Sequence, residues 1–258
     1  MDTPEDAGER VDAVATPATV QAHVTIPAVR VSIRSYFSPR LLWTAQHHAE
    51  LAGEIEKAAS GKTPFSIEHH GYVLSSIIAS VAFLEAMVNE LFQDAADGHV
   101  PTGGYIDPLS EESRRTMAEV WAITRGGRQP ALEKFDSLLR SAGAPLLDRK
   151  SDTFKNAEAT IDLRNRLIHF RPEDRSAEDE AHAIEKRILG KFSDNALMTG
   201  SGNAWWPDHA LGYGAAVWGH RSVRALADHV SDAIAIEPNY RRVEASGWFG
   251  TMPGEREL

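Results

Sequence analysis

The chain has 258 residues, of which 42% are apolar, and its 27 Lys and Arg against 37 Asp and Glu give a net charge of −10. A chain of this length buries about 70–75% of the surface that its unfolded form exposes, so it needs neither a metal nor a disulfide to fold. It contains no cysteine, which excludes a disulfide scaffold, a thiolate zinc site, an iron–sulfur cluster and a cysteine nucleophile.

The N-terminal part is predicted to lie outside the folded core. Residues 1–18 are rich in Asp, Glu, Ala, Thr and Pro and have almost no large apolar side chain, which predicts a disordered tail. Residues 19–37 are predicted to form an extended arm, because residues 23–34 are β-branched and roughly alternate in polarity. Pro27 would restrict a strand in this arm to the edge of a sheet.

Neither a secretory signal nor a membrane span is expected. The acidic start of the chain has no apolar segment of the kind that a secretory signal carries. The most apolar stretch, residues 75–84, is shorter than the roughly 20 residues that a membrane span requires. We therefore expect a cytoplasmic protein that does not insert into a membrane.

From about residue 38 the hydrophobic pattern has the period of a helix. Serine, glycine and proline mark most of the expected helix ends. The pattern predicts helices over residues 39–59, 66–96, 110–124, 131–139, 152–170, 177–189 and 209–236. Residues 237–258 show little periodicity and are predicted to be a tail. The expected fold is an all-α helical bundle in one domain over residues 38–236, with irregular termini.

Several familiar catalytic motifs are missing. The sequence has no HExxH, no Gly-x-Ser-x-Gly and no GxGxxG after a strand. The pairs His47-His48 and His69-His70 do not indicate a metal site, because adjacent side chains on a helix point about 100° apart. We expect these to be solvent-exposed helix histidines. Trp205 and Trp206, in a loop over residues 200–207, are expected to pack rather than to stack on nucleobases.

One segment contains several residues that could take part in catalysis. Arg164, Asn165 and His169 lie at the end of the predicted helix over residues 152–170, and Arg164 falls between two apolar strips. An arginine in such a place requires a partner, because burying an unpaired charge is costly. Glu85 interrupts the apolar stripe of the helix over residues 66–96, and Asn89 follows it by one turn. The pattern predicts that Glu85 and Arg164 face each other inside the bundle, with Asn89 close by.

The opposite face of the same helix is polar. Glu158, Asp162, Asn165 and His169 form a stripe there, about 140° from Arg164 on an ideal helix. A second copy of the chain could bring both faces to one ligand. The negative net charge requires any contact with RNA or DNA to occur at a local basic site. Residues 149–171 provide one, since they hold six basic and three acidic residues, with Arg166 and Arg171 among the basic ones.

These residues resemble a known family. Arg164-Asn165-x-x-x-His169 resembles the R-x4–6-H motif of HEPN domains, in which the residue after the arginine is typically polar and often Asn. Residues 80–92, which include Glu85 and Asn89, are similar to the Glu/Asn-bearing helix of bacterial members. Other Arg/His pairs at this spacing lack the Asn, the helix end and the apolar flanks. The resemblance implies a helical bundle that pairs so that two motifs form one cleft.

The resemblance also implies a function. Many HEPN domains are metal-independent ribonucleases of toxin–antitoxin and antiviral defence systems. Here His169 would act as general base or acid while a ribose 2′-OH attacks the neighbouring phosphate, since an imidazole titrates near neutrality. Arg164 would hold the phosphate and stabilise its developing charge. Asn165 would orient the histidine ring or bind the sugar, with Glu85 and Asn89 in support, and Arg166 and Arg171 would bind RNA.

The implied partners are RNA, for example a tRNA, a second copy of the chain, and an antitoxin or another protein. No cofactor or metal is expected. The alternative is a catalytically inactive HEPN-like module that binds a protein partner or a nucleotide. In that case Arg164 and Glu85 are a core ion pair, and His169 caps a helix C-terminus, where a cation is favoured.

Overall fold

The computed structural model describes residues 33–59, 65–124, 128–176 and 178–247. From Ser35 onward, the described residues belong to one compact unit. The tail predicted over residues 1–18 and nearly all of the strand predicted over 23–34 lie outside the described residues. The described end of the predicted arm, residues 33–37, forms no helix or strand.

The fold is all-α, as predicted, and the described residues contain no β-strand. Two short helical turns, Ala196–Met198 and Trp205–His209, lie between α6 and α7. The helices are α1 (Ser38–Ala58), α2 (Ile67–Ala96), α3 (Glu111–Ile123), α4 (Ala131–Ser141), α5 (Asp152–Ile168), α6 (Ala183–Ile188), α7 (Tyr213–Ala233) and α8 (Asn239–Ser246).

Serine side chains set three of the helix starts. The hydroxyls of Ser66, Ser110 and Ser151 each accept a hydrogen bond from the backbone N–H three residues further on, at the starts of α2, α3 and α5. Such a cap satisfies a backbone donor that the first turn of a helix leaves without a partner. This local chemistry explains why the predicted starts at residues 66, 110 and 152 agree with the structure to within one residue.

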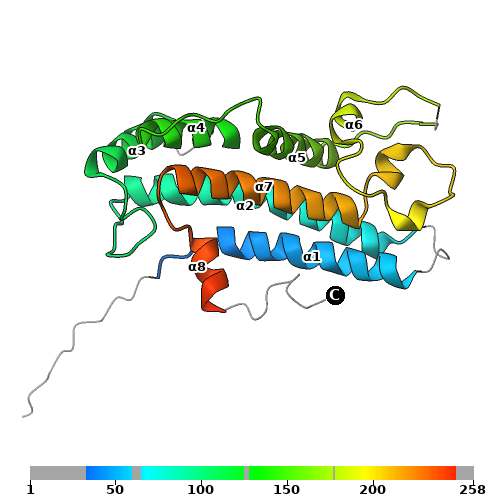
Figure 1. Ribbon diagram of the computed structural model, residues 1–258, viewed down its shortest axis with the longest axis horizontal. Coiled ribbons are helices and arrows are strands. Elements are labelled where there is room, and N and C mark those ends of the chain that lie inside the picture. Colours follow the sequence, from blue (N-terminus) through cyan, green and yellow to red (C-terminus); the bar gives the residue numbers. More distant parts are fainter. Residues whose placement is uncertain (1–32, 60–64, 125–127, 177, 248–258) are drawn as a thin grey trace, which may run out of the picture. The chain divides into compact units, whose positions relative to one another are not determined.

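The helices are stacked in three layers (Figure 1). Helices α2 and α7 lie side by side in the middle, α1 packs on one side of them, and α3, α4 and α5 follow one another along the other side. The central position of α2 agrees with its wide apolar face, which contributes fully buried side chains along most of its length, among them Ile77, Leu84 and Leu91. Because α2 contacts helices of both outer layers, residues on its different faces meet different partners.

Helix α2 also bears on the membrane expectation. By length and composition alone it is the one helix among the described residues that could cross a membrane. The apolar part of α2 is therefore longer than residues 75–84, the stretch on which the expectation of no membrane span rests. Such a helix alone is weak support for a membrane span, because the central helix of a packed bundle has the same composition. In this structure α2 packs against α1, α3, α4, α5 and α7.

Helix α6 is shorter than predicted. An acidic, exposed helix is predicted over residues 177–189, but α6 begins only at Ala183, and three of its side chains, Ile184, Glu185 and Ile188, are buried. The reason is local. The carboxylate of Asp179 accepts a hydrogen bond from the backbone N–H of Ser176, and the Ser176 hydroxyl accepts one from the N–H of Glu178. Such side chain to backbone bonds compete with helix formation.

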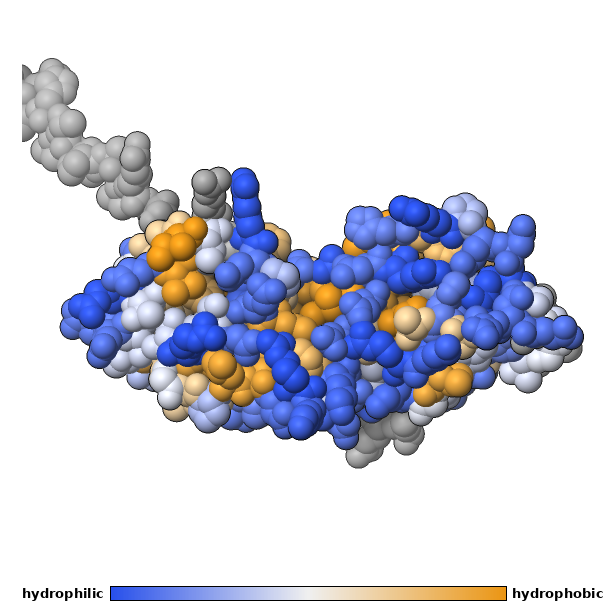
Figure 2. Space-filling model, turned by 90° about the horizontal axis from the view of Figure 1, so that it is seen from above, coloured by the Kyte–Doolittle hydropathy of each residue, from blue (hydrophilic) through white to orange (hydrophobic). Residues whose placement is uncertain are grey.

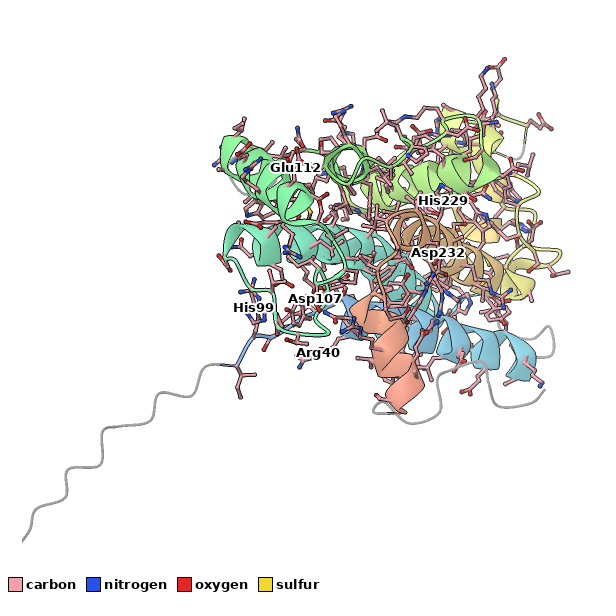
Figure 3. All side chains as sticks on the ribbon, turned by 60° about the vertical axis from the view of Figure 1, so that its left-hand side comes forward. Arg40, His99, Asp107, Glu112, His229 and Asp232 are labelled. Atoms are coloured by element: carbon pink, nitrogen blue, oxygen red, sulfur yellow. The ribbon has the colours of Figure 1, made fainter. Side chains whose placement is uncertain are left out.

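The C-terminal segment is not wholly an irregular tail. Residues 239–246 of the tail predicted over 237–258 form α8, which crosses the end of the bundle near α7 and α1 (Figure 1). Arg241 donates hydrogen bonds to the carboxylates of Asp228 and Asp232 on α7, and Arg224 on α7 pairs with Glu244. Figure 3 shows Asp232 on α7 at this end. Residues 248–258 lie outside the described residues.

A buried histidine of α7 predicts a pH dependence of stability. Burial, and then the positive charges of Arg221 and Arg224, lower the pKa of His220 from 6.5 to about 4. Between these values the unfolded chain binds a proton that the folded chain excludes, so stability falls as the pH falls through this window. From pH 7 to pH 5 the free energy of unfolding should drop by about 2 kcal/mol through this residue.

Urea unfolding of wild type and His220→Gln at the two pH values checks this prediction, since the variant should lose most of that difference. His229→Gln is the matched control because His229 lies exposed on the same helix (Figure 3). A pH difference that is equally large in His220→Gln and wild type would contradict the assignment to His220.

Candidate functional site

Helix α5 is held so that Arg164 faces α2. Its buried side chains divide between the two apolar clusters of the bundle: Phe154 and Ala157 join the larger one, and Leu163 joins the smaller one. These contacts fix the rotation of α5. With α5 in this orientation, the side chain of Arg164 reaches Glu85 on the neighbouring helix α2.

The predicted partner of Arg164 is confirmed. The guanidinium Nη2 of Arg164 donates a hydrogen bond to Oε1 of Glu85 on α2, and the two side chains form an ion pair. The pair is less buried than predicted, because the side chain of Arg164 is 20% exposed and that of Glu85 is 44% exposed. It lies at the edge of the contact between α2 and α5 rather than inside the bundle. Solvent screening therefore weakens its contribution to stability.

Asn89 lies near the pair, as predicted, but its hydrogen-bond partner was not foreseen. Its Oδ1 accepts a hydrogen bond of 2.8 Å from Nζ of Lys134 on α4. Lys134 is only 6% exposed. Burial lowers the pKa of Lys134, and the negative charge of Glu85 partly offsets this. Lys134 falls between the buried Ala131 and Leu138, on the apolar face of α4. A charged residue on the apolar face of a helix is the same signal that singles out Arg164 and Glu85, so the sequence already marks Lys134.

The two acidic residues of the predicted polar stripe on α5 are already engaged within the chain. Arg187, at the end of α6, forms ion pairs with both Glu158 and Asp162. Arg166, predicted to bind RNA, donates a 2.8 Å hydrogen bond to Glu173. These ion pairs leave fewer charged groups available to a ligand than the sequence suggests.

His169 lies at the exposed end of α5. It is the first residue beyond the helix, and its backbone N–H still bonds to the carbonyl of Asn165. Asn165, His169 and Arg171 are all exposed, and their side chains form no hydrogen bond or ion pair with any described residue. Among the described residues no such bond joins Arg164 to His169 either. Within one chain the arginine and the histidine are therefore not joined by a hydrogen bond.

The segment after His169 is fixed by two sets of ion pairs. Glu173 accepts hydrogen bonds from His182 as well as from Arg166, and these partners lower its pKa. Arg175 pairs with Glu185, whose side chain is 5% exposed. These contacts hold Glu173 against α5 and Arg175 against α6, so the backbone that follows His169 is anchored.

Both histidine pairs depart from the predicted exposure. His69 is fully buried, and its Nε2 lies 2.8 Å from Oε1 of Glu56 on α1. The same carboxylate accepts hydrogen bonds from the backbone N–H groups of Tyr213 and Ala196. Glu56 is distant in sequence, so no local spacing could reveal this pairing. His47 and His48 are partly buried rather than fully exposed.

The tryptophans pack, as predicted. Trp206 is fully buried, and Trp205 stacks on Phe192 while its Nε1 donates a hydrogen bond to Asp194. Trp218 contacts the same Phe192 ring. These contacts place the indoles against other side chains of the chain, and Trp205 and Trp218 stay partly exposed.

Figure 2 views the molecule from the side of α3, α4 and α5. Apolar side chains gather in the hollowed middle of this face, and hydrophilic side chains surround them. Comparison of the chain with family models, with curated proteins and with solved structures finds no match. The HEPN resemblance therefore rests on the residue pattern, and the activity that it implies is a prediction.

Proposed function

We propose that the protein is a metal-independent endoribonuclease of HEPN type, acting in defence or in a toxin–antitoxin system. The observation that carries the proposal is the ion pair between Arg164 and Glu85, which links the two helices that bear the motif. Asn165 and His169 lie exposed at the end of one of these helices. Their side chains form no hydrogen bond to the described residues, so they are free to contact a ligand.

The proposed reaction is an internal transesterification. The imidazole of His169 removes the proton from a ribose 2′-OH, which attacks the adjacent phosphorus and expels the 5′-oxygen of the next nucleotide. The expelled oxygen takes up a proton, from the protonated imidazole or from water, and leaves as a hydroxyl. Arg164 stabilises the charge that develops on the phosphate oxygens, and Glu85 holds its guanidinium in place. The products carry 2′,3′-cyclic phosphate and 5′-OH ends.

A second copy of the chain would complete the site. Ile168 and Phe170, which flank His169, are 49% and 45% exposed, although both are large and apolar. Burial of such side chains against another copy is favourable. A two-fold pairing through this end of α5 would place the His169 of each copy near the motif of the other. The acidic chain suits a defined target such as a tRNA better than RNA in general.

Incubation with total tRNA in excess EDTA tests the proposal. Wild type should cleave, and His169→Ala should lose at least about a hundredfold in rate, the usual contribution of a general base. His229→Ala removes an exposed histidine on α7 and should cleave like wild type. Absence of cleavage by wild type, or equal cleavage by His169→Ala, would end the ribonuclease proposal.

A second candidate function is an inactive module that binds a protein partner. It is favoured by the ion pairs that engage Glu158, Asp162 and Arg166 within the chain. Induced expression in cells separates the two functions. A ribonuclease should arrest growth in a way that Arg164→Ala relieves, whereas a binding module should leave both strains equally healthy.

A further inference from the structure

Lys134 is a buried cation that the proposed reaction does not yet use. It lies on α4, it is 6% exposed, and its Nζ donates a 2.8 Å hydrogen bond to Asn89. An ammonium group has three N–H donors, and Asn89 is its one hydrogen-bond acceptor among the described residues. Arg164 has a spare donor too, because its buried Nε has no hydrogen-bond partner. Two neighbouring cations on different helices thus have N–H donors that meet no acceptor among the described residues.

The charges of this cluster do not cancel. Arg164 and Lys134 each carry one positive charge, Glu85 carries one negative charge, and Asn89 is neutral. Without Lys134, Arg164 and Glu85 would form a neutral pair with little attraction for an anion. With Lys134 the cluster has a surplus of one positive charge. Lys134 is largely shielded from water, and charge interactions are stronger in such a place than in water.

We propose that Lys134, Asn89 and Arg164 form an anion site at the junction of α2, α4 and α5, which binds a phosphate group of the RNA. Lys134 is the most buried member of this cluster at 6% exposure, while the side chains of Arg164 and Glu85 are 20% and 44% exposed. Glu85 orients Arg164 and also competes with the phosphate for it. Lys134 is thus a positioning residue for the ligand, and this inference rests on the proposed function for the identity of that ligand.

The site predicts opposite effects for two substitutions. Lys134→Met removes the surplus charge while keeping a long apolar stem, so it should weaken binding of a phosphate chain about tenfold. Glu85→Gln removes the competing charge but keeps an acceptor for Arg164, so it should strengthen binding severalfold. Lys134→Arg keeps the charge and should stay within about twofold of wild type. A purely structural lysine would not produce these opposite changes.

Fluorescence anisotropy with a labelled 2′-O-methyl oligoribonucleotide measures this binding. The probe cannot be cleaved, because its attacking hydroxyl is blocked. For Lys134→Met, the slope of log affinity against log salt should also become less negative by about 0.7, the value for one lost contact to a single strand. Lys57→Met is the matched control, since Lys57 is an exposed lysine on α1, away from α4 and α5 and outside the basic segment of residues 149–171. Thermal melting establishes that each variant is folded.

The outcomes separate this inference from the nuclease proposal. Weaker binding by Lys134→Met together with tighter binding by Glu85→Gln supports the site, even if wild type cleaves no RNA. Unchanged binding in both variants overturns the site, even if wild type cleaves RNA. Equal weakening by Lys57→Met overturns it as well, because the effect would then be one of overall charge. If Lys134→Met does not fold, the result for Glu85→Gln decides.

Discussion

Replacing Gly214 by alanine should lower the free energy of unfolding by about 2–3 kcal/mol, the usual cost of forcing an extra carbon into a packed site. Gly214 is buried in the first turn of α7, and a Cβ atom there would lie 2.4 Å from the backbone oxygen of Ser193 and 2.6 Å from its hydroxyl. A backbone oxygen cannot rotate away as a side chain can. The start of α7 or the segment around Ser193 would have to move.

Gly71→Ala is the matched control for this prediction. Gly71 is exposed on α2, and a Cβ atom there would meet nothing within 4 Å. Alanine should stabilise this helix by about 0.5–1 kcal/mol relative to glycine. Urea unfolding of both variants should therefore give changes of opposite sign. A Gly214→Ala variant as stable as wild type would show that the contact between α7 and Ser193 is looser than the structure has it.

The second large effect is expected at Tyr240. This side chain is 1% exposed, its ring packs edge to face on Phe83 with the centroids 5.1 Å apart, and its hydroxyl donates a 2.7 Å hydrogen bond to Asp228. Tyr240→Ala should lower the free energy of unfolding by about 3–5 kcal/mol, the range for loss of a buried aromatic ring. Tyr240→Phe keeps the ring and should cost only about 1 kcal/mol.

Thermal unfolding and limited proteolysis together check this prediction. In Tyr240→Ala, α8 should become accessible to protease before the rest of the bundle, because it is a short helix at the end of the chain with one buried side chain. If the alanine and phenylalanine variants have the same stability, the ring contact with Phe83 does not hold α8 in place.

The parts of the fold that the sequence predicts best are those with strong local signals. The starts of α2, α3 and α5 are set by serine caps, and the position of α2 follows from its wide apolar face. Helix α8 has no such face, since Tyr240 is its one buried side chain. Its ion pairs to α7 join residues 9 to 20 positions apart, which no periodic pattern reveals.

The same distinction applies to the candidate site. The pairing of Glu85 with Arg164, 79 residues apart, could be predicted because each charge interrupts an apolar stripe. The exposure of this ion pair could not be predicted, because it depends on how closely α2 and α5 approach each other. The engagement of Glu158 and Asp162 by Arg187 could not be predicted either, since it requires α6 to fold back against α5.

His169 stands just beyond the last turn of α5, with φ −104° and ψ 29°. The 140° separation from Arg164 therefore does not apply to its ring, whose direction depends on the backbone that follows. That backbone is anchored through Glu173 and Arg175. A change at either anchor could reorient the imidazole while leaving the guanidinium untouched, so selection could tune the spacing of the two groups from outside the helix that carries them.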